Sequence, residues 1–170
     1  MKDIKTIKLS EFLDLNPTER LPKGTLARKI SMDQIEPHKK FVYSKYFEPY
    51  SGGSKFRNND TIMARITPCL ENGKTAFISC LNQNEIAFGS TEYIVFRAKE
   101  NISLSHFIYY LCISKLIREP AIKSMVGSSG RQRVQQTVLE ELEIPYFSIA
   151  EQQHIVDSIK KSTYGESLCN

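Results

Sequence analysis

Residues 60–96 read DTIMARITPCLENGKTAFISCLNQNEIAFGSTEYIVF and contain three apolar runs, rich in β-branched and aromatic residues, that are separated by polar loops. Within residues 61–67 the Ile and Ala side chains alternate with Thr, Met and Arg, which is the period of a half-buried strand and turns Arg65 away from the apolar face. Turn chemistry at residues 71–73 precedes a second extended run, and further extended runs follow within residues 86–96. The stretch therefore predicts a β-sheet whose charged loops cluster into a recognition surface.

The segments on either side of this stretch carry patterns typical of elements that pack on a sheet. A short helix is predicted over residues 11–15, and residues 26–35 predict a strand edge. From Ser103 the apolar positions recur with period 3.6 for about four turns. Pro120 fits the first position of the next helix, and Gly127 fits its C′ position. The chain therefore predicts an α+β fold in which helices pack on a twisted mixed sheet.

The last part of the chain predicts a further helix. Ser148 and Glu151 have the spacing of a capping box, which marks a first helical turn. An apolar stripe follows at helical spacing and consists of Ile155, Val156 and Ile159. Because no partner for this stripe is evident in the remaining sequence, we expect it to pack on a helix of another chain or of a second copy.

We therefore divide the chain into one domain over residues 1–147 and a helical segment over residues 148–170. The helix is expected to run for about three turns and to give way to a polar tail over residues 162–170. A length of 170 residues suits a single domain with a sizeable apolar core. The sequence contains no evident internal repeat or low-complexity tract.

Composition and cysteine spacing argue against several classes of protein. Hydrophobic residues make up 41% and charged residues 25%, as in an ordinary globular protein. The sequence has no signal peptide and no apolar run of the ~20 residues that span a bilayer, so we expect a cytoplasmic protein without a membrane partner. The cysteines at positions 69, 80, 112 and 169 form no CxxC pair, and the histidines have no ligand-like spacing to them, so we expect neither a metal nor a cofactor.

The net charge is only +4, but the basic residues are unevenly placed. The segment 38–57 interleaves Lys and Arg with Phe and Tyr, and basic and aromatic side chains together suit a nucleic-acid surface. A solvated loop whose aromatic rings pack back on the core explains the same composition. The DNA-binding candidates in this segment are Lys39, Lys40, Lys45, Lys55 and Arg57.

A glycine-flanked serine loop at residues 127–130 directly precedes two arginines and a glutamine. Backbone amides and hydroxyls in such a loop can face phosphate, and Arg and Gln side chains match the edges of guanine and adenine. We favour phosphate contacts for the arginines and leave Gln132 open between phosphate and base. A helix C-cap followed by a solvated turn is the alternative. The candidates here are Ser128, Ser129, Arg131, Gln132 and Arg133, and the set is completed by Arg65 and Lys74.

Five motifs, taken in order, resemble one family: DTIMARITPCLENGKTAF, FGSTEYIVFR, FIYYL, MVGSSGRQRV and IPYFSIAEQQHIVDSI. Over residues 1–160 the chain closely resembles the DNA-specificity (S) subunit of type I restriction-modification systems. The resemblance implies a non-catalytic target-recognition domain that reads one half of a split sequence in double-stranded DNA, followed by a long helix that spaces two such domains. It implies methyltransferase (M) subunits as partners, and a restriction (R) subunit that joins through the M–S complex. A single recognition domain implies a half-S or truncated form, with a second copy as a further partner.

Two alternatives come from other classes of function. A metal-dependent nuclease would use Asp60, Glu71 and Lys74, but a turn separates Glu71 from Lys74, so the two do not share a strand face. The sequence has neither a GxxxxGK[ST] loop nor a Gly-rich strand-to-helix fingerprint for a nucleotide. The second alternative is an assembly module that grips the M subunit through its C-terminal helix without reading DNA. It leaves the two basic segments without a role.

Overall fold

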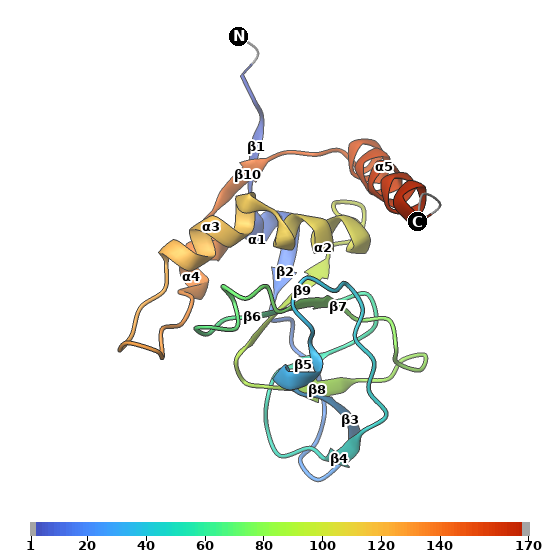
Figure 1. The fold of residues 1–170 in the computed structure, drawn as a ribbon, viewed down its shortest axis with the longest axis vertical. Helices are drawn as coiled ribbons and strands as arrows, with labels where there is room; N and C mark the ends of the chain where they lie inside the picture. Colours follow the sequence, from blue (N-terminus) through green and yellow to red (C-terminus); the bar gives the residue numbers. More distant parts are fainter. Residues whose placement is uncertain (1–2, 168–170) are drawn as a thin grey trace.

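The computed structural model describes residues 3–167 and arranges sheets and helices in layers (Figure 1). The first sheet has the strand order β2 (Leu13–Leu15), β9 (Tyr93–Ala98), β6 (Thr61–Ala64) and β7 (Thr75–Phe77). The second sheet has the order β4 (Phe47–Pro49), β3 (Leu26–Ile30), β8 (Ala87–Gly89) and β5 (Lys55–Phe56). A separate ladder joins β1 (Thr6–Lys8) to β10 (Glu143–Pro145). The α+β class is confirmed, and the strands are mixed because β3 and β8 run parallel while the first sheet is antiparallel.

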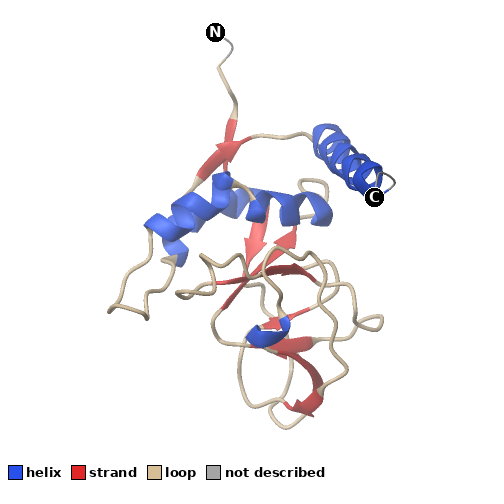
Figure 2. Ribbon diagram, viewed as in Figure 1, coloured by secondary structure: helices blue, strands red, loops and turns tan. Residues whose placement is uncertain are grey.

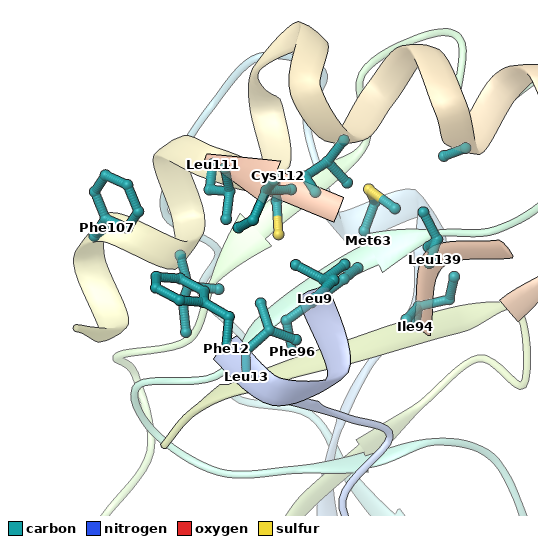
Figure 3. Packing of buried hydrophobic residues seen from close by; sticks show 14 of the residues in the cluster. Leu9, Phe12, Leu13, Met63, Ile94, Phe96, Phe107, Leu111, Cys112 and Leu139 are labelled. Atoms are coloured by element: carbon teal, nitrogen blue, oxygen red, sulfur yellow. The ribbon is translucent and has the colours of Figure 1, made fainter. Parts of the chain in front are cut away.

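The α-helices gather at one end of the molecule, next to the first sheet and away from the second (Figure 2). They are α1 (Leu9–Phe12), α2 (Ser105–Ile113), α3 (Lys115–Lys123), α4 (Gln136–Glu140) and α5 (Ile149–Ser167), and a 3₁₀ helix, η1 (Met32–Gln34), follows β3. Leu9 and Phe12 of α1 pack with Phe107 of α2 and Phe96 of β9 in the core between helices and sheet (Figure 3). Burial of this apolar face is the main reason why such short helices are stable here.

The first sheet is buried on both faces, which corrects the prediction of a half-buried strand over residues 61–67. Met63 of β6 faces the helical core, whereas Ile62 faces a second cluster shared with Tyr93 and Val95. All four residues of β6 are buried, and the strand ends at Ala64. The alternation in the sequence marks two different apolar environments rather than one apolar and one wet face.

The first helix begins earlier in the chain than the pattern indicated. Leu9 and Phe12 are fully buried and form one turn, whereas residues 13–15 of the predicted helix leave it and pair with β9. Leu13 is itself fully buried, so the apolar run serves a helix and then a strand. The pattern of three neighbouring apolar positions could not separate these two uses.

The helix predicted from Ser103 is interrupted at Ser114. The backbone there is extended (φ −76°, ψ 163°), and the Ser114 hydroxyl donates to Leu111 O at 2.6 Å. Pro120 consequently lies inside α3 and not at its first position. Gly127 is likewise not a C′ residue, because α3 ends at Lys123.

The C-terminal helix begins at the predicted capping box. Ser148 N–H donates to Glu151 Oε2 at 2.7 Å, and Glu151 N–H donates to Ser148 Oγ at 3.2 Å. The helix continues through Ser167, so the polar tail expected from residue 162 is helical as far as the structure describes it, and residues 168–170, with Cys169, lie outside the described part. None of the described helices is long and apolar enough to cross a membrane.

Candidate nucleic-acid interface

The segment between α3 and α4 contains residues 127–133, which we call the GSSGRQR loop. Its base is closed in both directions, because Val126 N–H donates to Arg133 O at 3.0 Å and Arg133 N–H donates to Val126 O at 2.9 Å. The loop is also docked on the chain after β6, where Thr67 N–H donates to Gln132 O at 3.0 Å. The loop therefore projects from a fixed base, as the free end of a closed hairpin.

Arg133 is held by an ion pair at this base. Its Nη2 lies 2.7 Å from Glu92 Oε1, and its Nε donates to both oxygens of the same carboxylate. These hydrogen bonds raise the pKa of Arg133. Arg65 lies alongside, since its N–H donates to Glu92 O at 2.9 Å and its guanidinium donates to Val134 O at 3.3 Å. The structure thus brings two predicted residues, Arg65 and Arg133, together around Glu92.

The outer part of the GSSGRQR loop is open to solvent. The exposed side chains are those of Ser128, Ser129, Arg131 and Gln132, and none of them makes a side-chain hydrogen bond within residues 3–167. Gly127 has φ +134°, and a Cβ there would lie 2.7 Å from Arg131 O, so the tight return of the loop requires glycine. Hydroxyl, amide and guanidinium groups are therefore presented outward for a ligand.

A groove of about 400 Å³ with polar and apolar lining residues lies beside Glu92, between the chain after β4 and the turn before β9. Its lining includes Lys29, Ser31, Ser51, Ser90 and Thr91. The two walls meet so closely that a Cβ on Gly53 would lie 1.9 Å from Gly89 O. Glu92 N–H donates to Ser90 Oγ at 3.0 Å, so the groove and the base of the GSSGRQR loop share one turn.

The segment 38–57 presents a group of solvent-exposed rings. Phe41, Tyr43, Tyr46 and Phe47 are 60%, 64%, 58% and 43% exposed. Lys45 is exposed among them, with its Nζ 5.8 Å from the centroid of the Tyr43 ring. We call these five residues the aromatic patch. The alternative interpretation of this segment was that its rings pack back on the core. It holds for Phe56, which is fully buried, but not for the four exposed rings of the aromatic patch. Exposed rings beside an ammonium group suit a nucleic-acid surface.

Lys55 and Arg57 from the same segment both contact Glu19, although the Arg57 side chain is 49% exposed. Lys55 Nζ donates to Glu19 O at 2.6 Å, and Arg57 Nη2 donates to Glu19 Oε2 at 2.6 Å. Arg97 bridges this carboxylate to Asp60, at 2.7 and 2.8 Å. Burial alone would raise the pKa of Glu19, but the hydrogen bonds from Arg57 and Arg97 outweigh it and lower the pKa. We therefore consider Lys55 and Arg57 weaker candidates for DNA contacts than Lys45.

The remaining predicted basic residues are scattered over the surface. Lys39 is exposed and forms an ion pair with Glu36. Lys40 is half-buried and turns towards α2, while Lys74 Nζ donates to Met32 O at 2.9 Å. The twelve residues therefore do not form one cluster. They divide into the GSSGRQR loop with Arg65, the aromatic patch with Lys45, and residues held by internal contacts.

The three residues of the nuclease alternative do not converge. Asp60 accepts two hydrogen bonds from Arg97, and Glu71 accepts one from Thr67 Oγ1 at 2.6 Å. Lys74 is occupied by a backbone carbonyl. In the part of the chain that the structure describes, no group of three His, Cys, Asp or Glu residues is arranged to hold a metal ion.

The apolar stripe of α5 has a partner within the chain, which corrects part of its predicted role. Val156 is 2% exposed and lies in the helical core, and Ile155 packs against that core. A shallow groove of about 450 Å³ remains open on the helix, lined by Phe147, Ala150, Glu151, His154 and Ile155. Ile159 is partly exposed on the next turn. A partner helix can therefore reach Ile155 and Ile159 but not Val156.

Two residues that position these surfaces were missed from the sequence. Glu92 holds Arg133 across 41 positions of sequence, and no local pattern marks it. Gln152 is fully buried; its amide donates to Ile102 O and Phe147 O, and its oxygen accepts from Leu104 N–H at 2.8 Å. Gln152 stands four positions before Val156, so its place on the apolar face of α5 was a usable signal.

Comparison with known proteins gives a consistent result. A family model described as "Type I restriction modification DNA specificity domain" matches residues 1–166. Similar curated proteins are the type I restriction enzyme EcoAI and EcoEI specificity subunits of Escherichia coli, 33% identical over 130 residues and 32% identical over 131. The matches cover 76% and 74% of this chain but 21% and 20% of those proteins, so the chain spans about a fifth of their length.

Solved structures show the same fold. The HsdS subunit from Thermoanaerobacter tengcongensis has a TM-score of 0.73 at 18% identity, and the match covers 97% of this chain and 43% of that one. The type I restriction-modification S subunit from M. genitalium has a TM-score of 0.52 at 21% identity, with 95% and 39% covered. Both structures resemble this chain over nearly all of its length.

Proposed function

Because this chain belongs to the family of type I restriction modification DNA specificity domains, we propose that it binds double-stranded DNA, reads one half of a split target sequence and brings methyltransferase and restriction subunits to it. In this proposal the chain performs no chemistry, and its partners modify and cleave the DNA in the cytoplasm. One observation carries the proposal: four polar side chains project to solvent from the GSSGRQR loop, whose base is fixed by backbone bonds and by the Arg133–Glu92 ion pair.

The two exposed surfaces have different roles in this proposal. Arg131, Ser128 and Ser129 bind phosphate, which positions the domain on any sequence. The aromatic patch with Lys45 chooses the sequence, since exposed rings and a flexible loop can follow base edges and groove shape. Gln132 has the donors and acceptors for either role. The groove beside Ser90 adds hydroxyl groups next to the phosphate contacts.

The division into a recognition domain at residues 1–147 and a helix from residue 148 onward belongs to the same proposal. The groove beside Ile155 takes a helix of the M subunit or of a second copy, and the restriction subunit joins through that complex. Anchoring by Gln152 fixes the direction in which α5 leaves the domain.

Methylation mapping in cells that contain the chain and its methyltransferase subunit tests the proposal. We expect one methylated motif, which changes when Lys45 and Tyr46 are replaced by Ala and persists at lower occupancy when Arg131 is replaced. An unchanged motif in the first variant and a switched motif in the second would reverse the two roles. A purified complex that captures the methyltransferase subunit but binds no duplex would instead support the assembly module.

A further inference from the structure

An open pocket of about 600 Å³ lies where the start of the segment 38–57 meets α2 and α5. The helix α5 lies beside α2 at this end of the molecule (Figure 1). The lining includes Lys40, Phe41, Tyr109, Tyr110, Lys160 and Thr163. No carboxylate is among the lining residues that the structure describes. Ile113 and Ile159 also line it, so the pocket combines an apolar, largely aromatic wall with two lysines.

The Lys40 ammonium forms no ion pair with a carboxylate among the described residues. It lies 3.1 Å from His106 Nδ1 and donates to the Tyr110 hydroxyl at 3.2 Å. Its Nζ is 4.6 Å from the centroid of the Tyr110 ring and 5.3 Å from that of Phe41. Lys39, the neighbour in sequence, is by contrast paired with Glu36. The ammonium group has three N–H donors and uses two of them in these contacts, so one donor remains for a ligand.

The charge of this pocket is uncompensated. Burial, and then repulsion from Lys160, lower the pKa of Lys40. Burial, Lys40 and Lys160 together lower the pKa of His106, which stacks on Phe77 behind the ammonium. Two like charges that face one partly buried space favour the entry of an anion between them.

We propose that this pocket binds a backbone phosphate of duplex DNA, with Lys40 and Lys160 as its cationic donors. The proposal rests on the proposed function and adds α5 to the DNA-contacting surface. Phe41 lines the pocket and is 60% exposed, so the pocket adjoins the first residue of the aromatic patch. Glu151 and Asp157 of α5 are not among the lining residues.

The salt dependence of duplex binding by the full chain, with its methyltransferase subunit, tests the proposal. Lys160→Gln and Lys40→Gln should each make the slope of log K against log[salt] shallower by about 0.9. Between 50 and 200 mM salt, the loss of affinity of each variant should therefore be roughly 3.5-fold smaller than that of the wild type. Lys161→Gln is the matched control, because Lys161 is exposed on the same turn of α5 but does not line the pocket. An unchanged slope in both pocket variants would overturn the inference.

A second readout does not depend on affinity. In NMR titrations the pKa of His106 should rise when a short duplex binds, because phosphate neutralises the facing ammonium groups, and it should also rise in free Lys160→Gln. A His106 pKa that DNA leaves unchanged would contradict the pocket as its site. If Lys160→Gln keeps its DNA slope but loses the methyltransferase subunit, the pocket binds a protein carboxylate and the proposal fails. A wild-type chain that binds no duplex would remove the proposed function as well, so the two failures are distinguishable.

Discussion

The guanidinium of Arg133 lies 2.7 Å from the carboxylate of Glu92, and this ion pair joins the loop after α3 to the turn before β9. The two side chains are 46% and 22% exposed, so the pair is partly open to solvent. The carboxylate neutralises Arg133, whereas Arg131, two residues earlier, is exposed with its charge uncompensated by any neighbour in the described chain. The two arginines of the GSSGRQR loop are therefore not equivalent.

Removing the carboxylate should release Arg133 towards DNA. We expect Glu92→Gln to steepen the salt slope of duplex binding by about 1 on all sequences, and Arg131→Ala to make it shallower by about 1. The measurement is the affinity for one specific and one unrelated duplex at several salt concentrations. In the double variant Glu92→Gln/Arg133→Ala the extra slope should vanish. A slope in Glu92→Gln equal to that of the wild type would show that Arg133 only closes the loop.

Gln152 should be far more important for stability than its neighbour in sequence. Gln152→Ala removes a fully buried side chain and the hydrogen bonds that it makes to Leu104 N–H and to two carbonyl oxygens, so we expect a loss of about 2 kcal/mol in the free energy of unfolding. Gln153→Ala, at an exposed site that contacts Asp157, should cost less than about 0.5 kcal/mol. Urea denaturation of both variants provides the comparison. Equal losses would mean that α5 is not anchored through Gln152.

The buried carboxylate of Glu19 should make stability depend on pH. Its lowered pKa means that the folded chain binds fewer protons than the unfolded chain, so its contribution is complete above about pH 4.3 and is lost as pH falls through the folded pKa. We expect Glu19→Gln to destabilise by about 2 kcal/mol at pH 7, because Arg57 loses its carboxylate partner and Arg97 keeps only Asp60. That difference from the wild type should shrink below pH ~4 in thermal unfolding. Glu36→Gln, which breaks an exposed pair, should change stability by less than about 0.5 kcal/mol at either pH.

The open groove on α5 predicts where assembly occurs. Ile155→Lys combined with Ile159→Lys should prevent capture of the methyltransferase subunit or of a second copy, since Ile155 lines the groove and Ile159, which also lines the pocket around Lys40, is partly exposed one turn further along α5. Gln153→Lys, exposed on the same helix, is the control for added charge. Light scattering and co-purification give the readout, and circular dichroism confirms that the variant is folded. If the double variant assembles as the wild type does, the contact with the partner lies outside this face of α5.

The elements that local patterns define were predictable. Strands β6 and β9 follow from the β-branched and aromatic runs of residues 60–96, and the start of α5 follows from Ser148 and Glu151. The break at Ser114 was not predictable, because helical periodicity continues through it and the extended backbone there is set by packing of two helices on one sheet. Burial of β6 on both faces was not predictable either. The alternation of its side chains looks the same whether the second face packs on another apolar cluster or faces solvent.

The surface was predictable in composition but not in arrangement. Sequence identified the basic segments, yet it could not show that Arg57 turns to Glu19 while Lys45 stays exposed. These partners come from distant parts of the chain, and their pairing depends on the topology of the sheets. Residues of similar chemistry therefore divide between internal and outward roles that only the fold assigns.

The pairing of β1 with β10 determines when the helical core can close during synthesis. Thr6 pairs with Pro145, and Leu9 N–H donates to Leu142 O at 2.8 Å, so the first described strand finds its partner only after nearly all of the recognition domain has left the ribosome. At ordinary rates of translation this takes on the order of ten seconds. During that time Leu9 and Phe12 have no closed core to enter, because Leu139, Ile144 and Val156 complete it last. The helical core of the nascent chain therefore stays incomplete until α5 emerges.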